Sequence, residues 1–159
     1  MLLVIDNGSV YTKNLIDFLH NKNILFDKQT PELLDLKLLD NYNSFILSGR
    51  RKNEKKTNKI NSKIIDHAIQ NDKKLLGICY GAEILALTLG GTIRKLTFQQ
   101  KGTEKINIQR ENPLSNDNLQ VFESHSFEIS KLPDILITIG DSKNCKFEII
   151  QYDKKPIFG

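Results

Sequence analysis

Cysteine, tryptophan and long apolar runs are scarce in this chain of 159 residues, which has two cysteines and no tryptophan. No apolar run approaches the ~20 residues that a membrane-spanning helix requires. The opening segment, MLLVIDNGSVYTK, has neither the basic region nor the small-residue cleavage site of a signal peptide. We therefore expect no membrane span, no disulfide framework and a location in a reducing cytoplasm.

Further absences restrict the ligands that the chain can be expected to bind. The net charge of +4 is mild, and no basic segment is interleaved with aromatic residues, so nucleic acid is not an expected partner. The three histidines and two cysteines are scattered without metal-ligand spacing, and there is no glycine-rich phosphate loop. We therefore expect neither a metal nor another cofactor.

Short apolar runs alternate with helical patterns in the first 91 residues. The apolar runs that predict buried strands lie at 2–6, 23–27, 44–49 and 73–79. Helical spacing of apolar residues recurs at 10–20, 33–42, 62–68 and 81–91. This alternation is typical of an α/β protein whose parallel sheet is covered by helices on both faces. After Gly91, strand-like segments follow one another across short turns, which predicts an antiparallel extension of the same domain.

The fourth strand leads into GICYG, which spans 77–81 with Cys79 at its centre. A turn of the form Gly-x-nucleophile-x-Gly strains the backbone of its central residue and exposes that side chain at the carboxyl edge of the sheet. The positive N-terminal end of the next helix is expected to lower the thiol pKa. The Tyr80 N–H is also placed to stabilise an oxyanion. The segment thus predicts a nucleophilic cysteine.

A structural thiol is the alternative interpretation of Cys79, since free cysteine packs as a small hydrophobe. The paired glycines and the strand and helix around them favour the nucleophile. Cys145, in DSKNCKFE, has no comparable setting and is interpreted as an ordinary strand or turn residue.

The segment LLGICYGAEILALTLGGTIRK (75–95) resembles the nucleophile segment of class I (triad-type) glutamine amidotransferases. Within that family it is similar to the glutaminase subunits of archaeal GMP synthase and of anthranilate synthase. The resemblance continues, in the family's order, through LLVIDNGSVYTKNLIDFL, FILSG, ESHSFEI and KPIFG. It covers the whole chain and implies an open, mostly parallel, flavodoxin-like sheet with an antiparallel C-terminal extension.

The resemblance also implies roles for particular residues. Cys79 would attack the side-chain amide of glutamine, form a glutamyl thioester and release ammonia. The backbone N–H groups of Gly49 and Tyr80 would form the oxyanion hole. The main chain of Ser126 and Phe127 would hold the amino-acid end of the substrate.

The family's proton-transferring His and Glu are expected a few residues after KPIFG, where this sequence ends at Gly159. Either the natural protein continues through a short C-terminal segment or it lacks this base. We favour the first, because the chain stops inside a strand approaching the site. We therefore interpret residues 1–159 as one domain without its C-terminal segment. His125 is not expected to replace the base, because its segment binds substrate through the backbone.

Glu83 departs from the family, which usually carries Gln at this position in the first turn of the helix. A carboxylate facing the bound glutamine could pair with the substrate's ammonium group. Beside the sulfur, however, it would raise the thiol pKa. The alternative is a helix N-terminal glutamate that is favoured by the dipole.

The third departure is SGRRKNEKKTNKINSK (48–63), where relatives carry Gly-Gly-Pro or Pro-Gly-Pro after the strand. Seven residues from Arg50 to Lys63 are basic, and Glu54 is the single acidic one. A solvated loop and helix start is the simpler interpretation. The alternative is a docking surface for an acidic partner or a phosphate-bearing ligand.

Three functions are consistent with these observations. The first is a glutaminase subunit that passes ammonia to a separate ATP-dependent synthetase, because a chain of this length has no room for an ATP-using acceptor domain. GMP synthase is the first expectation for that partner, with anthranilate or aminodeoxychorismate synthesis close behind. The second is a related cysteine hydrolase acting on another gamma-glutamyl substrate. The third is a non-catalytic regulatory homologue.

Overall fold

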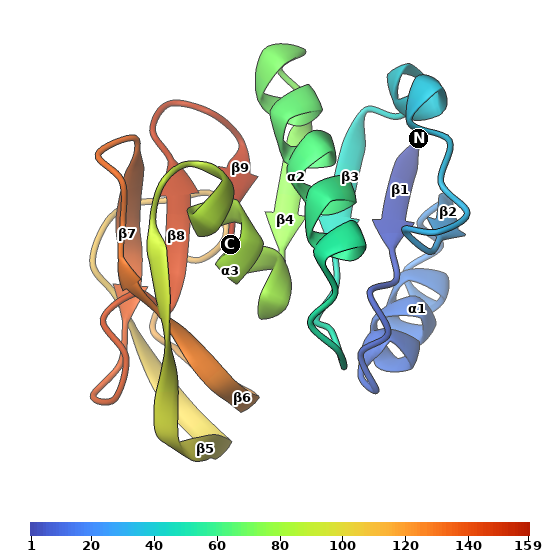
Figure 1. Ribbon diagram of the computed structural model, residues 1–159. Helices are drawn as coiled ribbons and strands as arrows, with labels where there is room; N and C mark the ends of the chain where they lie inside the picture. The colour runs from blue at the N-terminus through green and yellow to red at the C-terminus, as the bar shows by residue number, and fades with distance from the viewer.

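A nine-stranded mixed sheet organises the computed structural model, which describes residues 1–159 (Figure 1). The strands of the first half are β1 (Leu2–Ile5), β2 (Phe26–Gln29), β3 (Ser44–Leu47) and β4 (Lys74–Gly77). Those of the second half are β5 (Thr92–Ile108), β6 (Leu119–Lys131), β7 (Leu136–Asp141), β8 (Ile149–Tyr152) and β9 (Ile157–Phe158). Their order across the sheet is β2-β1-β3-β4-β9-β8-β7-β5-β6.

The strand pairing in this sheet changes from parallel to antiparallel at β9. β1 to β4 and β9 pair in parallel, whereas β8, β7, β5 and β6 continue the sheet by antiparallel pairing. The expected parallel sheet with an antiparallel extension is therefore confirmed. The last strand in the sequence, β9, lies at the centre of the sheet, and Gly159, which follows it, lies against Ala82 in the adjoining helix.

Three α-helices and one 3₁₀-helix follow the first four strands, one after each. They are α1 (Thr12–Asn21), η1 (Leu36–Asn41), α2 (Lys55–Gln70) and α3 (Tyr80–Thr88). α2 contacts β3, β4, η1 and α3 on one face of the sheet. α1 joins β1 to β2 in the opposite direction across the sheet, so right-handed crossover places it on the other face. None of these helices is both long and apolar enough to cross a membrane.

The core lies between the parallel strands and the helices α2 and α3. β1 and β3 contribute apolar side chains to it, and Ile64 and Ile65 of α2 and Leu85 of α3 are completely buried against them. Strands covered on both faces become nearly continuous apolar runs, as in LLVI and SFIL. This explains why the sequence pattern located these strands.

Several boundaries differ from the sequence expectation. α2 begins at Lys55 rather than near residue 62, because the inward positions of its first two turns are the buried polar residues Thr57 and Asn61. The segment at 33–42 forms only η1. Two of the strand-like segments expected after Gly91, at 92–97 and 103–108, belong to one long strand, β5, whose pairing with β6 is irregular between Lys95 and Gln100.

Figure 1 shows the parallel strands pointing toward one edge, where the β3–α2 loop and the β4–α3 turn lie, and β5 and β6 extending past that edge. β6 contacts α3. It also reaches the start of α1, where the Phe122 and Tyr11 rings meet edge-on with their centroids 6.2 Å apart. The antiparallel extension therefore forms one wall of the carboxyl edge, where ligands bind in open α/β sheets.

Candidate active site

Cys79 occupies the sharp turn between β4 and α3. Its backbone φ of 55° and ψ of −106° are strained for a residue with a side chain. The side chain is exposed. The turn is held by the Ile78 N–H, which donates to the Leu47 carbonyl oxygen at 2.9 Å. The predicted strain and exposure of Cys79 are confirmed, and the structural-thiol alternative is not.

The glycines on either side of Cys79 permit two close backbone contacts. A Cβ atom on Gly77 would lie 2.4 Å from the Gly81 backbone, inside α3. A Cβ atom on Gly81 would lie 2.3 Å from the carbonyl oxygen of Leu47, on β3. Both separations are shorter than real contacts allow, so glycine is required on both sides for β3, β4 and α3 to meet at this corner.

Tyr80 and Gly49, the two residues expected to supply the oxyanion donors, lie next to Cys79. The Tyr80 N–H, at the first position of α3, is close enough to the Cys79 thiol to act against the rise in its pKa. Gly49 follows β3, and a Cβ built on it would lie 3.7 Å from the Cys79 Cβ and 3.2 Å from Ser9 Oγ. The fold thus brings residues from two neighbouring β–α connections to one thiol.

A buried polar network holds the Gly49 loop in place. The Asn7 N–H donates to Ser48 Oγ at 2.9 Å, and Asn7 Nδ2 donates to the Ser48 carbonyl oxygen at 3.0 Å. Asn61, on α2, donates to Asn7 Oδ1 at 2.8 Å. Sequence reasoning identified neither Asn7 nor Asn61 as part of the site. The available signal was Asn61 at a core-facing helical position, where a polar side chain needs a partner.

Glu83 is buried in the first turn of α3 and pairs with Arg50. The two side chains are each 10% exposed, and Arg50 Nη2 lies 3.5 Å from Glu83 Oε2. Glu83 Oε2 has no hydrogen-bond partner. The alternative interpretation, in which Glu83 interacts only with the helix dipole, is therefore wrong. The interpretation of Arg50 as part of a solvated loop is also wrong, because its guanidinium turns inward toward the helix.

The environment of Cys79 raises its pKa, contrary to the lowering expected from the helix end. Although Cys79 has surface exposed to solvent, the protein around its thiol desolvates the sulfur, which is the largest cause of the raised pKa, and the Glu83 carboxylate adds to it. The Tyr80 N–H and the Arg50 guanidinium act in the opposite direction. Glu83 itself has a raised pKa, because burial outweighs the attraction of Arg50 and His125.

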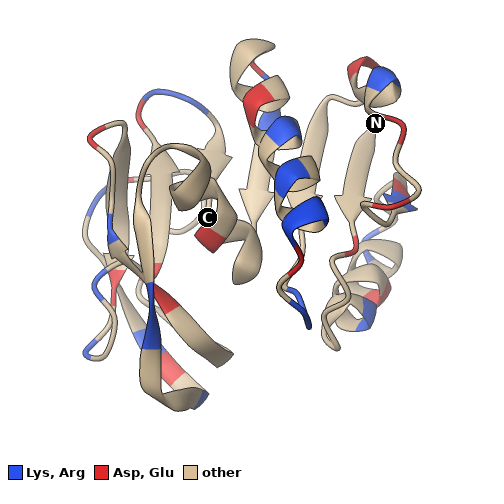
Figure 2. Ribbon diagram, in the orientation of Figure 1, with Lys and Arg blue, Asp and Glu red and all other residues tan.

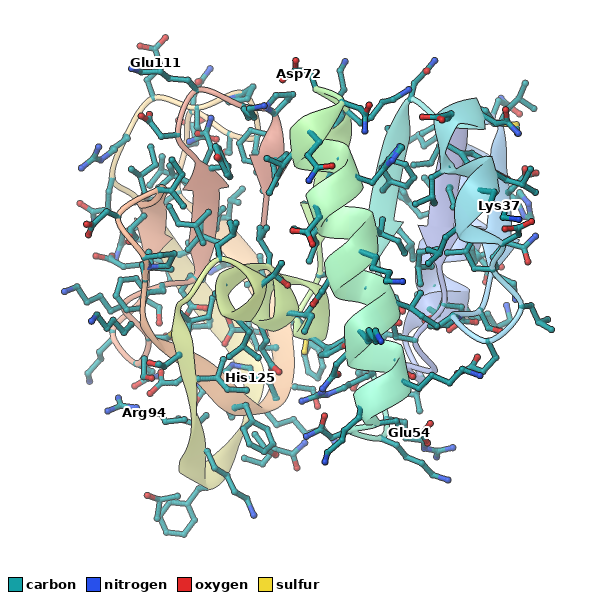
Figure 3. The ribbon with its side chains drawn as sticks, turned by 45° about the horizontal axis from the view of Figure 1, so that its top comes forward. Lys37, Glu54, Asp72, Arg94, Glu111 and His125 are labelled. Atoms are coloured by element: carbon teal, nitrogen blue, oxygen red, sulfur yellow. The ribbon has the colours of Figure 1, made fainter.

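Ser126 and Phe127 lie on β6, in the wall beside α3. Phe127 pairs with Lys95, and His125 with Gln100, so Ser126 has no partner in the register with β5. His125 Nδ1 lies 2.7 Å from the Phe127 carbonyl oxygen, and Nε2 lies 3.3 Å from Glu123 Oε2. Figure 3 shows His125 next to α3. Both of its ring nitrogens have partners within the protein, and that His125 is not the base stays a prediction.

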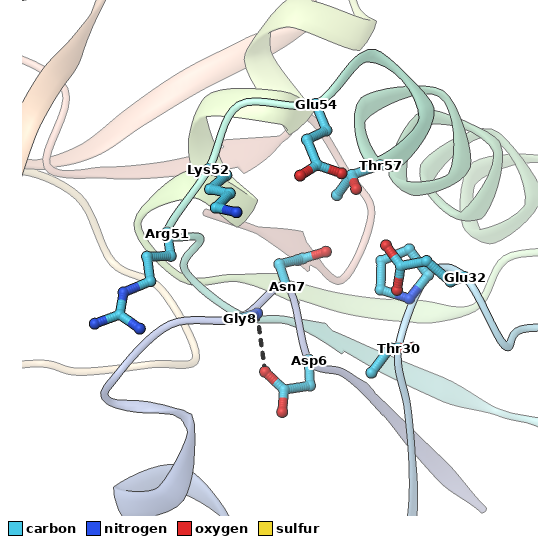
Figure 4. Close-up of a pocket in the computed structure, with 10 residues that line it drawn as sticks. Asp6, Asn7, Gly8, Thr30, Glu32, Arg51, Lys52, Glu54 and Thr57 are labelled. Atoms are coloured by element: carbon cyan, nitrogen blue, oxygen red, sulfur yellow. Dashed lines mark hydrogen bonds between the residues drawn. The ribbon is translucent and has the colours of Figure 1, made fainter.

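A separate polar cavity of about 270 Å³ lies farther along the same edge (Figure 4). Its walls come from the ends of β1 and β2 and from the β3–α2 loop, and none of its lining residues is hydrophobic. Arg51 and Lys52 line it, together with the carboxylates of Asp6, Glu32 and Glu54. Cys145 lies elsewhere, buried between β7 and β8, where burial raises its pKa to about 12.

The sequence model of the glutamine amidotransferase class-I family matches residues 3–159 of this chain. The chain belongs to the class-I glutamine amidotransferase family. The match covers every element around Cys79, and it confirms the resemblance that the nucleophile segment indicated.

Similar proteins agree with this assignment. A glutamine-hydrolyzing GMP synthase subunit of Methanocaldococcus jannaschii is 26% identical over 165 residues, covering 100% of this chain and 85% of that protein. The GMP synthase of Sodalis glossinidius is 23% identical, and the match covers 99% of this chain but only 32% of that protein. A glutamine amidotransferase structure from Thermotoga maritima superposes with a TM-score of 0.82 at 21% identity, covering 99% of this chain and 73% of that one, which shows a shared fold.

Proposed function

We propose that this chain is a glutaminase subunit that hydrolyses glutamine through Cys79 and supplies ammonia to a separate synthetase. The observation that carries the proposal is the strained, exposed Cys79 with Tyr80 and Gly49 beside it. A thiolate, an oxyanion site and a proton shuttle are what two-step covalent amide hydrolysis requires.

In the proposed reaction, the Cys79 thiolate forms a C–S bond with the side-chain amide carbon of glutamine. The negative charge that develops on the amide oxygen is stabilised by the N–H groups of Gly49 and Tyr80. The C–N bond then breaks, and the nitrogen leaves as ammonia after it is protonated. Water hydrolyses the glutamyl thioester, which releases glutamate and restores the thiol.

The protonating group is proposed to be the family's histidine, which the resemblance places after the KPIFG segment. β9 carries the end of that segment to the site, since Gly159 lies against Ala82, three residues from Cys79. The main chain of Ser126 and Phe127 is proposed to hold the amino-acid end of glutamine. The free register position of Ser126 supports this role, because its main chain is not matched to a residue of β5.

Glu83 is proposed to contact the substrate. Its Oε2 is buried and forms an ion pair with Arg50 at 3.5 Å but no hydrogen bond, so it can accept one from an N–H of a ligand. The same carboxylate is the observation that favours the second candidate function, hydrolysis of another gamma-glutamyl substrate. Comparison of glutamine with gamma-glutamyl amides distinguishes the two.

The partner is proposed to be the ATP-dependent synthetase of GMP formation. The support is that relatives matching 99% or more of this chain are named as subunits of glutamine-hydrolyzing GMP synthase in Methanocaldococcus jannaschii and Thermoplasma acidophilum. Addition of that synthetase with its nucleotide substrates is expected to increase ammonia release. If the synthetase of anthranilate formation gives the increase instead, the choice of partner is wrong.

The testing experiment measures ammonia release from glutamine by the natively encoded protein, with and without the synthetase. Wild type and Cys145→Ala are expected to release ammonia, and Cys79→Ala is expected to release none. Labelling of Cys79 by a glutamine-mimicking diazoketone provides a second measurement if turnover without a partner is slow. Absence of both turnover and labelling in the wild type contradicts the proposed function and leaves the hydrolase of another gamma-glutamyl substrate and the non-catalytic homologue.

A further inference from the structure

Arg50 differs from every other basic residue of the segment 50–63. The other six are exposed, and they form the positively charged surface of α2 and the loop before it (Figure 2). Arg50 instead places its guanidinium over the ring of Tyr80, with the central carbon 4.2 Å from the ring centroid. Burial of an arginine in a segment that is otherwise solvated indicates a specific role for this side chain.

Hydrogen bonds connect Arg50 to both sides of the site. Its Nη1 donates to Asn53 Oδ1 at 2.7 Å and to Asn58 Oδ1 at 3.2 Å. The Tyr80 hydroxyl donates to the same Asn58 oxygen at 2.7 Å. Arg50 directly follows Gly49, and Tyr80 directly follows Cys79. The stack and the shared asparagine therefore tie together the two backbone segments that carry the candidate oxyanion donors.

The same guanidinium lies beside the one carboxylate of α3. Arg50 Nη2 and Glu83 Oε2 are 3.5 Å apart, and both side chains are largely withdrawn from water. The charged groups that act on the Cys79 sulfur are Glu83 on α3, Arg50 on the β3–α2 loop and Glu123 on β6. Two of the three are negative, and Arg50 is the only cation among them. Those that act on Glu83 are Arg50 and His125.

We infer that Arg50 is a positioning residue for the Cys79 nucleophile, which joins the Gly49 loop to the Tyr80 turn and offsets the Glu83 charge beside the sulfur. The inference rests on the proposed nucleophilic role of Cys79. It assigns a function to the basic residue that stands where relatives have the small residues of the loop. Glu83 is tolerated next to a thiol because Arg50 is there to compensate its charge.

The experiment measures the rate at which iodoacetamide alkylates Cys79 as a function of pH, with the modified peptide quantified by mass spectrometry. This readout reports thiolate formation and does not require glutamine. Removal of Arg50 leaves Glu83 uncompensated, so the alkylation midpoint of Arg50→Ala is expected to rise by about one pH unit. Arg50→Lys retains a positive charge and is expected to keep the midpoint within about 0.3 unit, with slower glutamine turnover because the stack and the paired hydrogen bonds are lost.

Two further variants separate charge from structure. Arg51→Ala removes a neighbouring arginine that faces the polar cavity instead of the helix (Figure 4), and no change in the midpoint is expected. Glu83→Gln in the Arg50→Ala background is expected to return the midpoint to the wild-type value or below it. A purely structural arginine would not give this reversal. If Arg50→Ala does not fold by circular dichroism, Arg50→Gln replaces it with the same expectation.

An unchanged midpoint in folded Arg50→Ala overturns the inference, and so does a raised midpoint that Glu83→Gln fails to reverse. The alkylation experiment and the glutamine assay can fail separately. If the midpoint shifts as expected while wild type neither hydrolyses glutamine nor is labelled by its analogue, Arg50 still positions a reactive thiol, and the assigned substrate is wrong. If glutamine is hydrolysed but the midpoint does not move, the glutaminase assignment stands without Arg50.

Discussion

Replacement of Gly81 by alanine tests the geometry of the nucleophile corner, because two physical effects predict opposite results. Gly81 lies within α3, and helix propensity alone predicts that alanine stabilises the protein by about 1 kcal/mol. The structure predicts the reverse. An alanine Cβ would stand 2.3 Å from the Leu47 carbonyl oxygen, whereas real Cβ atoms essentially never approach closer than 3.0 Å, so α3 and β3 must separate by roughly 0.7 Å.

The cost of that separation can be set against the gain in propensity. Overpacking in a well-packed core costs about 1–3 kcal/mol, and the upper end applies here because both colliding groups belong to buried backbone. After the propensity gain is subtracted, Gly81→Ala is expected to lower the free energy of unfolding by about 2 kcal/mol. The assay is urea unfolding followed by circular dichroism, with the midpoints compared at a common slope.

The matched control is Gly90→Ala, at the other end of α3. Gly90 has a φ of 95° and open space around its missing Cβ, so only backbone strain of about 1 kcal/mol is expected there. A Gly81→Ala protein as stable as the wild type, or more stable, refutes the argument that close backbone approach requires glycine at this corner. A larger loss in Gly90→Ala than in Gly81→Ala refutes it equally.

Two predictions concern buried polar groups away from the thiol. Burial, with the nearby Glu123 carboxylate, raises the pKa of Glu148 to about 7. Between its ordinary pKa of about 4.5 and this value, Glu148 is protonated in the folded state and ionised in the unfolded chain. The free energy of unfolding therefore falls as pH rises through this window. In urea unfolding, the wild type is expected to lose about 2 kcal/mol more than Glu148→Gln between pH 5 and 8. If the free energies of unfolding of the two proteins change in parallel with pH, the prediction is contradicted. Asn61→Ala leaves the buried Asn7 Oδ1 without its hydrogen-bond donor and is expected to cost about 2 kcal/mol in the same assay. Lys59→Ala, on the exposed side of α2, is its control, with an expected change within about 0.5 kcal/mol.

Local patterns in the sequence were sufficient to predict the order of strands and helices in the first half and the Cys79 corner, although several boundaries differ in the structure. Strands buried on both faces must be continuously apolar, and a strained turn between such a strand and a helix must have glycines where backbones touch. Residues close together in the sequence meet both requirements, as the segment 73–91 does with its apolar strand and its two glycines. The resemblance located Gly49, Ser126 and Phe127 for the same reason, because each lies in a short recognisable segment.

Only the tertiary structure decided how charged and polar side chains meet. The basic residues from Arg50 to Lys63 look alike in the sequence, yet Arg50 alone turns inward, because the partners that receive it lie on the Tyr80 turn, on α2 and at Glu83. The net effect on the Cys79 pKa likewise depends on burial and on charges from three separate elements. Hydrophobic periodicity is a property of one segment, whereas the field at a thiol is a sum over segments that folding brings together.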